Sequence, residues 1–366
     1  MKRSILSELL LTTWREPNTF PDLPTAQKEL ILRQARRAGL LASLQTVLKQ
    51  ANVLDRLSPR IQDYLEGSQI IGTEQERSIR WEVNRIHRAF YGTALPVILL
   101  KGAAYVMLNL PVAKGRLVGD VDILLPKTDL PLAQQCLHAH DWVTVKANPY
   151  DQHYYREWMH EWPPLRHRYR QTEVDMHHAI LPITGRLHPD STRLLANVQP
   201  VPGYDGVWTL GSQDLVLHAM AHLFYDNDFQ QAGLRNLLDL DGLLRHYGQN
   251  PGFWESLVTR AQELELTRPL YYALHFTAKL CHTPIPPIHI SKPGWLTRIL
   301  MNRLIPWAIL PENPNQHSKG VVAGLAQWLL YVRSHWLRMP PSLLLPHLAR
   351  KWTRRWHFNV WHRRSV

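Results

Sequence analysis

Cysteine is scarce in this chain. Cys136 and Cys281 are its two cysteines among 366 residues. So few cysteines exclude a disulfide framework and a zinc site built from cysteine ligands. Such a composition suits a reducing compartment, and we therefore expect the protein in the cytoplasm.

Long hydrophobic runs are also missing. The longest candidate, residues 321–332, is shorter than the roughly 18–20 apolar residues that a membrane-spanning helix needs, and it ends at Arg333. Near the start of the chain Glu8 interrupts a short apolar stretch, and no small-residue cleavage site follows. We expect neither a membrane span nor a signal peptide.

Acidic residues are absent from 313–366, although the whole chain has 30 of them. This segment carries nine Lys or Arg and five of the fourteen Trp, so it supplies most of the net charge of +12. Basic and aromatic side chains suit an RNA surface or an anionic membrane, and both partners remain open for 350–364. A stripe at helical spacing predicts instead a helix packed on the core: Trp328, Tyr331, Val332, His335 and Trp336.

Hydrophobic periodicity predicts four segments along the chain. They are an N-terminal helical region (1–93), an α/β core (94–210), a helical region packed on that core (211–312) and the basic, Trp-rich C-terminal segment (313–366). In the first segment we expect helical structure over 25–48 and a helix from Thr73 to about Phe90. Within the core, short apolar runs predict strands in 96–101, 116–125, 142–146 and 172–179.

Two acidic residues interrupt one of these strands. Asp is disfavoured inside strands, yet the run Gly119-Asp-Val-Asp-Ile-Leu-Leu125 contains Asp120 and Asp122. Because strand side chains alternate, both carboxylates point to the same face. Neighbouring carboxylates repel each other unless a cation lies between them, and Mg²⁺ prefers oxygen ligands.

A third acidic residue lies on a later strand. In Thr172-Glu-Val-Asp-Met-His-His178, Asp175 and His177 share one face. If this strand pairs with the first, Asp175 joins the other two carboxylates, and three carboxylates can hold two metal ions. His177 either positions a substrate, acts as a base or is a packed, hydrogen-bonded histidine.

Basic residues precede the carboxylates in the chain. Lys101-Gly102 ends the first core strand, where a glycine lets a phosphate approach backbone N–H groups. Lys101 adds a point charge, and Arg116 offers a guanidinium fork for phosphate oxygens.

The series Leu100-Lys-Gly102, Arg116, Gly119-Asp-Val-Asp-Ile-Leu-Leu125 and Val174-Asp-Met-His177 resembles the bacterial uncharacterised nucleotidyltransferase family. That family shares its superfold with DNA polymerase beta. The resemblance covers roughly residues 80–250, with 233–240 as the helix behind the site. It implies an α+β fold, in which a nucleotidyltransferase-like mixed β-sheet core carries helical N-terminal and C-terminal extensions.

The resemblance also implies roles for individual residues. Asp120 and Asp122 match the metal-binding pair, and Asp175 matches the third carboxylate, so all three are expected to be catalytic metal ligands. The expected nucleotide-binding residues are Lys101, Gly102, Arg116 and His177. Ala103 stands where the family's superfold has the Ser of a Gly-Ser motif, which removes a hydroxyl contact to phosphate.

These residues predict a transferase that uses Mg²⁺ (or Mn²⁺) and a nucleoside triphosphate. We expect it to move a nucleotidyl group, AMP, to a hydroxyl-type acceptor. The acceptor remains open among a small molecule, a peptide, an RNA and a protein. The alternative is an inactive protein of the same fold that serves as a nucleotide-binding or nucleic-acid-binding scaffold.

Overall fold

The computed structural model describes residues 8–145, 148–226, 229–311 and 320–346. The stretch 350–364, for which nucleic-acid or membrane contact was left open, lies outside them. The α-helices are α1 (Leu9–Arg15), α2 (Thr25–Arg37), α3 (Leu41–Gln50), α4 (Pro59–Ala89), α5 (Lys101–Met107), α6 (Leu130–His138), α7 (Pro149–Trp158), α8 (Ser191–Leu195), α9 (Ser212–Ala221), α10 (Phe229–Tyr247), α11 (Phe253–Glu263), α12 (Thr267–Cys281), α13 (Trp295–Ile309) and α14 (Val321–Arg338). A π-helical turn, η6 (His222–Asp226), follows α9.

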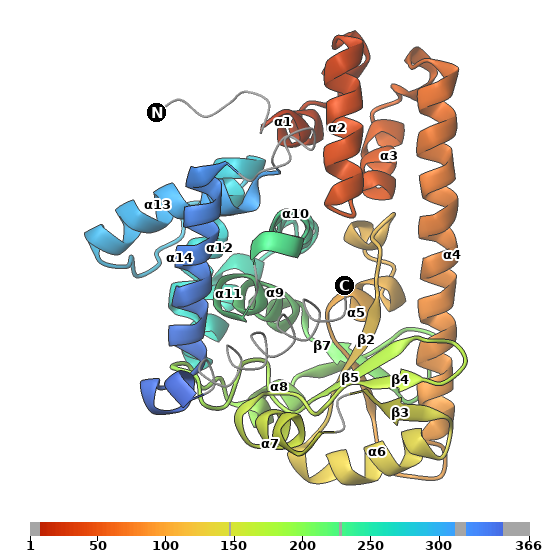
Figure 1. The fold of residues 1–366 in the computed structure, drawn as a ribbon, viewed down its shortest axis with the longest axis vertical. Helices are drawn as coiled ribbons and strands as arrows, with labels where there is room; N and C mark the ends of the chain where they lie inside the picture. Colours follow the sequence, from red (N-terminus) through yellow and green to blue (C-terminus); the bar gives the residue numbers. More distant parts are fainter. Residues whose placement is uncertain (1–7, 146–147, 227–228, 312–319, 347–366) are drawn as a thin grey trace, which may run out of the picture.

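One mixed sheet forms the centre of the fold, as Figure 1 shows. Its strands are β1 (Val97–Leu99), β2 (Asp120–Leu124), β3 (Trp142–Thr144), β4 (Leu165–His167), β5 (Glu173–His177), β6 (Val198–Pro200) and β7 (Val207–Leu210). The spatial order is β3-β4-β5-β2-β1-β7-β6. Strand β2 pairs parallel to β5 and antiparallel to β1, and β1 pairs parallel to β7. The mixed sheet and its helices confirm the expected α+β fold.

The central strands are apolar because both faces of the sheet are covered. All three residues of β1 are buried, and so are the last four of β2. Helix α4 packs on β1 and β2, while α9 packs on β7 and α5. The sequence predicted β1, β2, β3 and β5 correctly, but it did not predict β4, β6 or β7.

The N-terminal helices begin and end at other residues than predicted. The segment 25–48 forms two helices and not one, because Gly39 adopts φ +66° and ends the helical backbone between α2 and α3. Helix α4 begins at Pro59, not at Thr73, because proline suits the first turn of a helix, where no intrahelical partner is needed. Thr73 lies inside α4.

The C-terminal helices cover one side of the sheet and end in a pair, α13 and α14, that lies across the molecule from α4 (Figure 1). The stripe expected to face the core does not do so throughout. Trp328, Val332 and Trp336 are about half exposed, while Ala323, Ala326 and Leu330 take the buried face of α14. Within the described residues, no helix combines the length and the apolar character that crossing a membrane requires.

Candidate functional site

Two neighbouring parallel strands bring three carboxylates together. In the β2–β5 register, Asp122 lies opposite Asp175, and Asp120 lies opposite Glu173. The carboxylate oxygens of Asp120, Asp122 and Asp175 lie within 4.8 Å of one another. The condition stated from the sequence, that the two strands are neighbours, is therefore met.

Lys101 connects β1 to these carboxylates. Its Nζ donates a hydrogen bond of 2.7 Å to Oδ1 of Asp122, and both side chains are largely buried. The residue adopts φ +45°, a left-handed conformation that costs a non-glycine residue about 1–2 kcal/mol. Strain of this kind persists where the surrounding structure enforces it, and here it accompanies the turn from β1 into α5.

The carboxylates have opposite pKa shifts. Burial raises the pKa of Asp122, but the Lys101 charge and the hydrogen bond from His177 outweigh burial and hold it well below its usual range. The Asp122 charge, followed by burial, raises the pKa of Asp120. Burial, Glu161 and Asp122 raise the pKa of Asp175 well above its ordinary value. Negative charge thus accumulates here beyond what Lys101 neutralises.

One buried carboxylate oxygen is left without a partner. Within the described residues, Oδ1 of Asp175 accepts no hydrogen bond. A buried acceptor of this kind is costly unless a ligand satisfies it. Three converging carboxylates with such an oxygen fit a hard divalent cation, for which oxygen ligands are preferred.

His177 orients Asp122. Its Nε2 lies 2.8 Å from Oδ1 of Asp122, and its ring is fully buried. Because an ionised carboxylate can only accept, Nε2 carries the proton and donates it. His177 does not line the cavity described below, so the structure places it against Asp122 and not toward open space.

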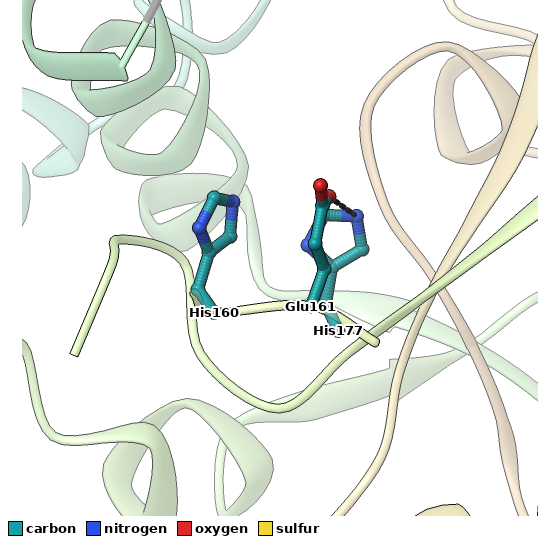
Figure 2. Close-up of side chains that lie close together, drawn as sticks. All are labelled: His160, Glu161 and His177. Carbon is teal, nitrogen blue, oxygen red and sulfur yellow. Dashed lines mark ion pairs between the residues drawn. The ribbon is translucent and has the colours of Figure 1, made fainter. Parts of the chain in front are cut away.

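A second group of possible metal ligands adjoins the first. The atoms of His160, Glu161 and His177 that could bind a metal ion lie within 4.8 Å of one another. Figure 2 shows the Glu161 carboxylate over the His177 ring. Oε2 of Glu161 is 3.6 Å from Nε2 of His177. An isolated β-bridge between Glu161 and His177 fixes this approach. His160 and Glu161 were not predicted from the sequence, because they lie in a loop whose position no local pattern encodes.

Arg116 lies against Gly102. A side chain at position 102 would place its Cβ 2.3 Å from Nη1 of Arg116. The space that the glycine leaves is therefore filled by a guanidinium group, whereas the sequence suggested room for a phosphate. Nε of Arg116 donates a hydrogen bond of 2.8 Å to Oδ2 of Asp239, a residue of α10. Both side chains of this ion pair are about 90% buried.

A cavity of about 290 Å³ opens between the sheet and the C-terminal helices. Six of the predicted site residues line it: Lys101, Gly102, Arg116, Asp120, Asp122 and Asp175. Six residues that the sequence did not assign to the site line it as well: His160, Glu161, His222, Arg235, Asn236 and Asp239. Ala103 is fully buried and is not part of the cavity wall.

Arg235 stands out among the unassigned residues. Its Nε is buried and has no hydrogen-bond partner in the part of the chain that the structure describes. Burial, and then the charge of Arg116, lower its pKa. Two guanidinium groups in one cavity favour an anionic ligand with several oxygens.

Comparison with known proteins identifies one family. The family described as "Uncharacterised nucleotidyltransferase" matches residues 24–282 of the chain. This match is wider than the resemblance seen in the sequence, because it includes α2, α3 and α4 as well as α11 and α12. No curated protein and no solved structure matches.

Proposed function

The chain belongs to the uncharacterised nucleotidyltransferase family, and we propose that it transfers a nucleotidyl group from a nucleoside triphosphate to a hydroxyl-type acceptor. One observation carries the proposal. Three carboxylates from adjacent strands converge in the same cavity as Lys101, Arg116 and Arg235. Carboxylates for a cation, next to cationic side chains for phosphate, are what phosphoryl-type transfer requires.

In this proposal Asp120, Asp122 and Asp175 hold Mg²⁺, or Mn²⁺ in its place. The bound ion would neutralise charge that develops on the phosphate oxygens during transfer. Lys101 and His177 hold Asp122 in one orientation by two hydrogen bonds to the same oxygen, Oδ1, so that Oδ2 would be the oxygen offered to the cation.

The proposed reaction is an in-line displacement at the α-phosphorus. The acceptor oxygen forms a bond to the α-phosphorus while the bond to the β-phosphate oxygen breaks and pyrophosphate leaves. Asp175 takes the acceptor's proton. Its position in the carboxylate cluster supports this role, because a general base must lie within reach of the proton that it removes.

The cationic side chains bind the triphosphate. Lys101 lies at the edge of the carboxylate cluster, and Arg116 is fixed by Asp239 with its Nη1 over Gly102. Gly102 has no side chain and so leaves the space that the Arg116 guanidinium occupies. His177 supports the site indirectly, through its hydrogen bond to Asp122. In this proposal, all four residues that the sequence assigned to nucleotide binding contribute to the site, two of them directly and two through a neighbouring side chain.

The direct test is transfer of an α-phosphate label. Each of the four nucleoside triphosphates is offered with Mg²⁺ or Mn²⁺ and a fractionated bacterial lysate as the source of acceptors. We expect the label to reach an acceptor with wild-type protein and to be lost with Asp122→Asn. Asp63→Asn, an exposed aspartate on α4, serves as the matched control.

The outcomes separate the two functions. Label transfer that survives Asp122→Asn contradicts the assigned metal ligands. Cation-dependent nucleotide binding without transfer, across all lysate fractions, favours the alternative of a scaffold that binds nucleotide or nucleic acid. The Ser-to-Ala difference at 103 gives that alternative little support, because Ala103 is not on the cavity wall.

We further propose a cytoplasmic location, supported by two free cysteines, Cys136 and Cys281. The acceptor classes stay those named from the sequence: a small molecule, a peptide, an RNA or a protein. The label assay distinguishes them by the fraction in which the product appears.

A further inference from the structure

The outward face of α13 is apolar. Trp295, Leu296, Ile299 and Leu300 are each at least half exposed, and their spacing places them on one side of the helix. The opposite side, with Met301 and Ile305, is buried against the protein. A surface helix of a globular protein ordinarily presents polar residues to water, so this face is unusual.

The outward face of α14 has the same character. It carries Val321, Leu325, Trp328, Val332 and Trp336, all of which are exposed and recur at intervals of three or four residues. Helix α14 packs against α13. Figure 1 shows the two helices side by side. Each of them carries one of these exposed apolar stripes.

The two helices carry basic residues and no acidic ones: Arg298 and Arg303 are on α13, and Arg333 and Arg338 are on α14. From residue 266 to the end, the sequence contains fourteen Lys or Arg and one acidic residue, Glu312. The first 265 residues are nearly balanced, with 28 basic and 29 acidic residues, so the last part of the chain carries all of the net positive charge. Arg186 extends the basic character, because its guanidinium stacks on Trp336 at 4.5 Å.

We propose that the outward faces of α13 and α14 form a docking surface for an anionic lipid bilayer. An apolar stripe with Trp, flanked by cations and free of acidic residues, is the pattern of a helix that lies in a membrane interface. Exposed Leu, Ile and Val side chains do not suit nucleic acid, which offers phosphates and stackable bases. The buried inner faces keep both helices on the protein, so only their outer faces enter the lipid.

This surface lies outside the family's shared region. The family match ends at residue 282, before α13 begins. The proposal is therefore independent of the proposed transferase chemistry, and its test needs neither nucleotide nor turnover.

The test is vesicle flotation of the full-length protein. Vesicles of phosphatidylcholine alone are compared with vesicles that also contain phosphatidylserine, over a series of NaCl concentrations. We expect binding to the anionic vesicles that weakens with salt, and much weaker binding to the neutral ones.

Variants place the binding on the two helices. Leu296→Asn with Leu300→Asn, combined with Leu325→Asn and Val332→Asn, removes apolar side chains that are exposed, so the fold is expected to survive. We expect binding to fall by about tenfold or more, since each lost apolar side chain weakens interfacial insertion. Ile70→Asn with Ile71→Asn on α4 is the matched control, because both residues are similarly exposed. We expect it to bind as wild type does.

Three results overturn the proposal. The first is unchanged binding by the four-residue variant, which would place the lipid contact elsewhere in the basic segment. The second is no flotation with either vesicle type. The third is a chain that self-associates through α13 and α14, seen as a larger mass by light scattering that the four-residue variant abolishes.

Discussion

Asp175 illustrates at the residue scale how binding and stability oppose each other. Its pKa is raised because burial and three neighbouring carboxylates, Glu161, Asp122 and Asp120, disfavour the charged form. A group whose pKa is higher in the folded than in the unfolded state binds its proton more tightly when folded. Its contribution to stability is therefore present at low pH and is lost as the pH rises through the folded-state value.

This reasoning makes a prediction about Asp175→Asn. Without metal, at pH 8, we expect the variant to be more stable than wild type by about 1 kcal/mol, which raises Tm by about 2–4 °C, because a buried charge is gone. At pH 5 the difference should shrink, since wild-type Asp175 is then more protonated. Adding Mg²⁺ should raise the Tm of wild type and leave that of Asp175→Asn almost unchanged.

The measurement is thermal unfolding in EDTA and in Mg²⁺ at both pH values. Glu173→Gln is a matched control on the same strand, because Glu173 pairs with Arg166 and is not one of the three clustered carboxylates. An equal Mg²⁺ shift in wild type and Asp175→Asn would contradict the assignment of Asp175 as a ligand.

At the scale of elements, the first turn of α5 requires a glycine, Gly102, because no side chain fits there. Gly102 lies where Arg116 and Val118 from the following loop approach the helix. Gly115, at φ +72°, precedes Arg116, and a Cβ there would meet the backbone of Ala42 at 2.4 Å. Both glycines are therefore required by close packing, and together they fix where the Arg116 guanidinium lies.

We predict that Gly102→Ala displaces Arg116. The expected cost is about 1–3 kcal/mol of stability, as for other overpacked positions, together with weaker binding of a triphosphate. Urea unfolding and a titration with fluorescent ATP measure the two effects. Gly67→Ala in α4 is the matched control, because nothing lies within 4 Å of its added Cβ. It should be neutral or stabilising, since alanine favours helix over glycine. Wild-type triphosphate affinity in Gly102→Ala would show that Arg116 does not bind phosphate.

The sequence predicted the central elements better than the peripheral ones. Strands β1 and β2 were visible because buried apolar runs identify them locally. Strand β6 is a short, largely exposed edge strand, and its partner β7 is only four residues long, so neither has a distinctive local pattern. Likewise Asp120 and Asp122 were visible as charges inside an apolar strand. Glu161 and Arg235 were not, because only the fold brings their loop and helix to the cavity.

At the scale of the whole molecule, α14 belongs to the folded structure although it lies beyond the family match. Leu330 and Ala326 are buried, and Arg333 donates a hydrogen bond of 2.8 Å to the carbonyl of Phe224 in η6. That π-helical turn begins at His222, which lines the cavity. The C-terminal helix therefore supports one wall of the candidate site.

We predict different outcomes for two truncations. Ending the chain after residue 346 keeps every described element, and Tm should stay within about 2 °C of wild type. Ending it after residue 312 removes α14, exposes apolar surface on α13 and α10, and should lower Tm by about 5 °C or more. Calorimetry on both proteins measures the difference. Equal Tm values for the two truncations would show that α14 adds nothing to the fold.

The strand order also determines when the candidate site can form during folding. In the chain, α6, β3, α7 and β4 separate Asp122 from Asp175, and β1 pairs with β7, which comes later still. Such distant pairings close large loops and form slowly. We therefore expect cation binding to require that β2 and β5 have already paired in the sheet. If the site is absent from the folding transition state, Mg²⁺ should slow unfolding while leaving the rate of refolding nearly unchanged. A stopped-flow experiment that found faster refolding in Mg²⁺ would instead place the β2–β5 pairing early, and the carboxylates would then be part of the nucleus from which this protein folds.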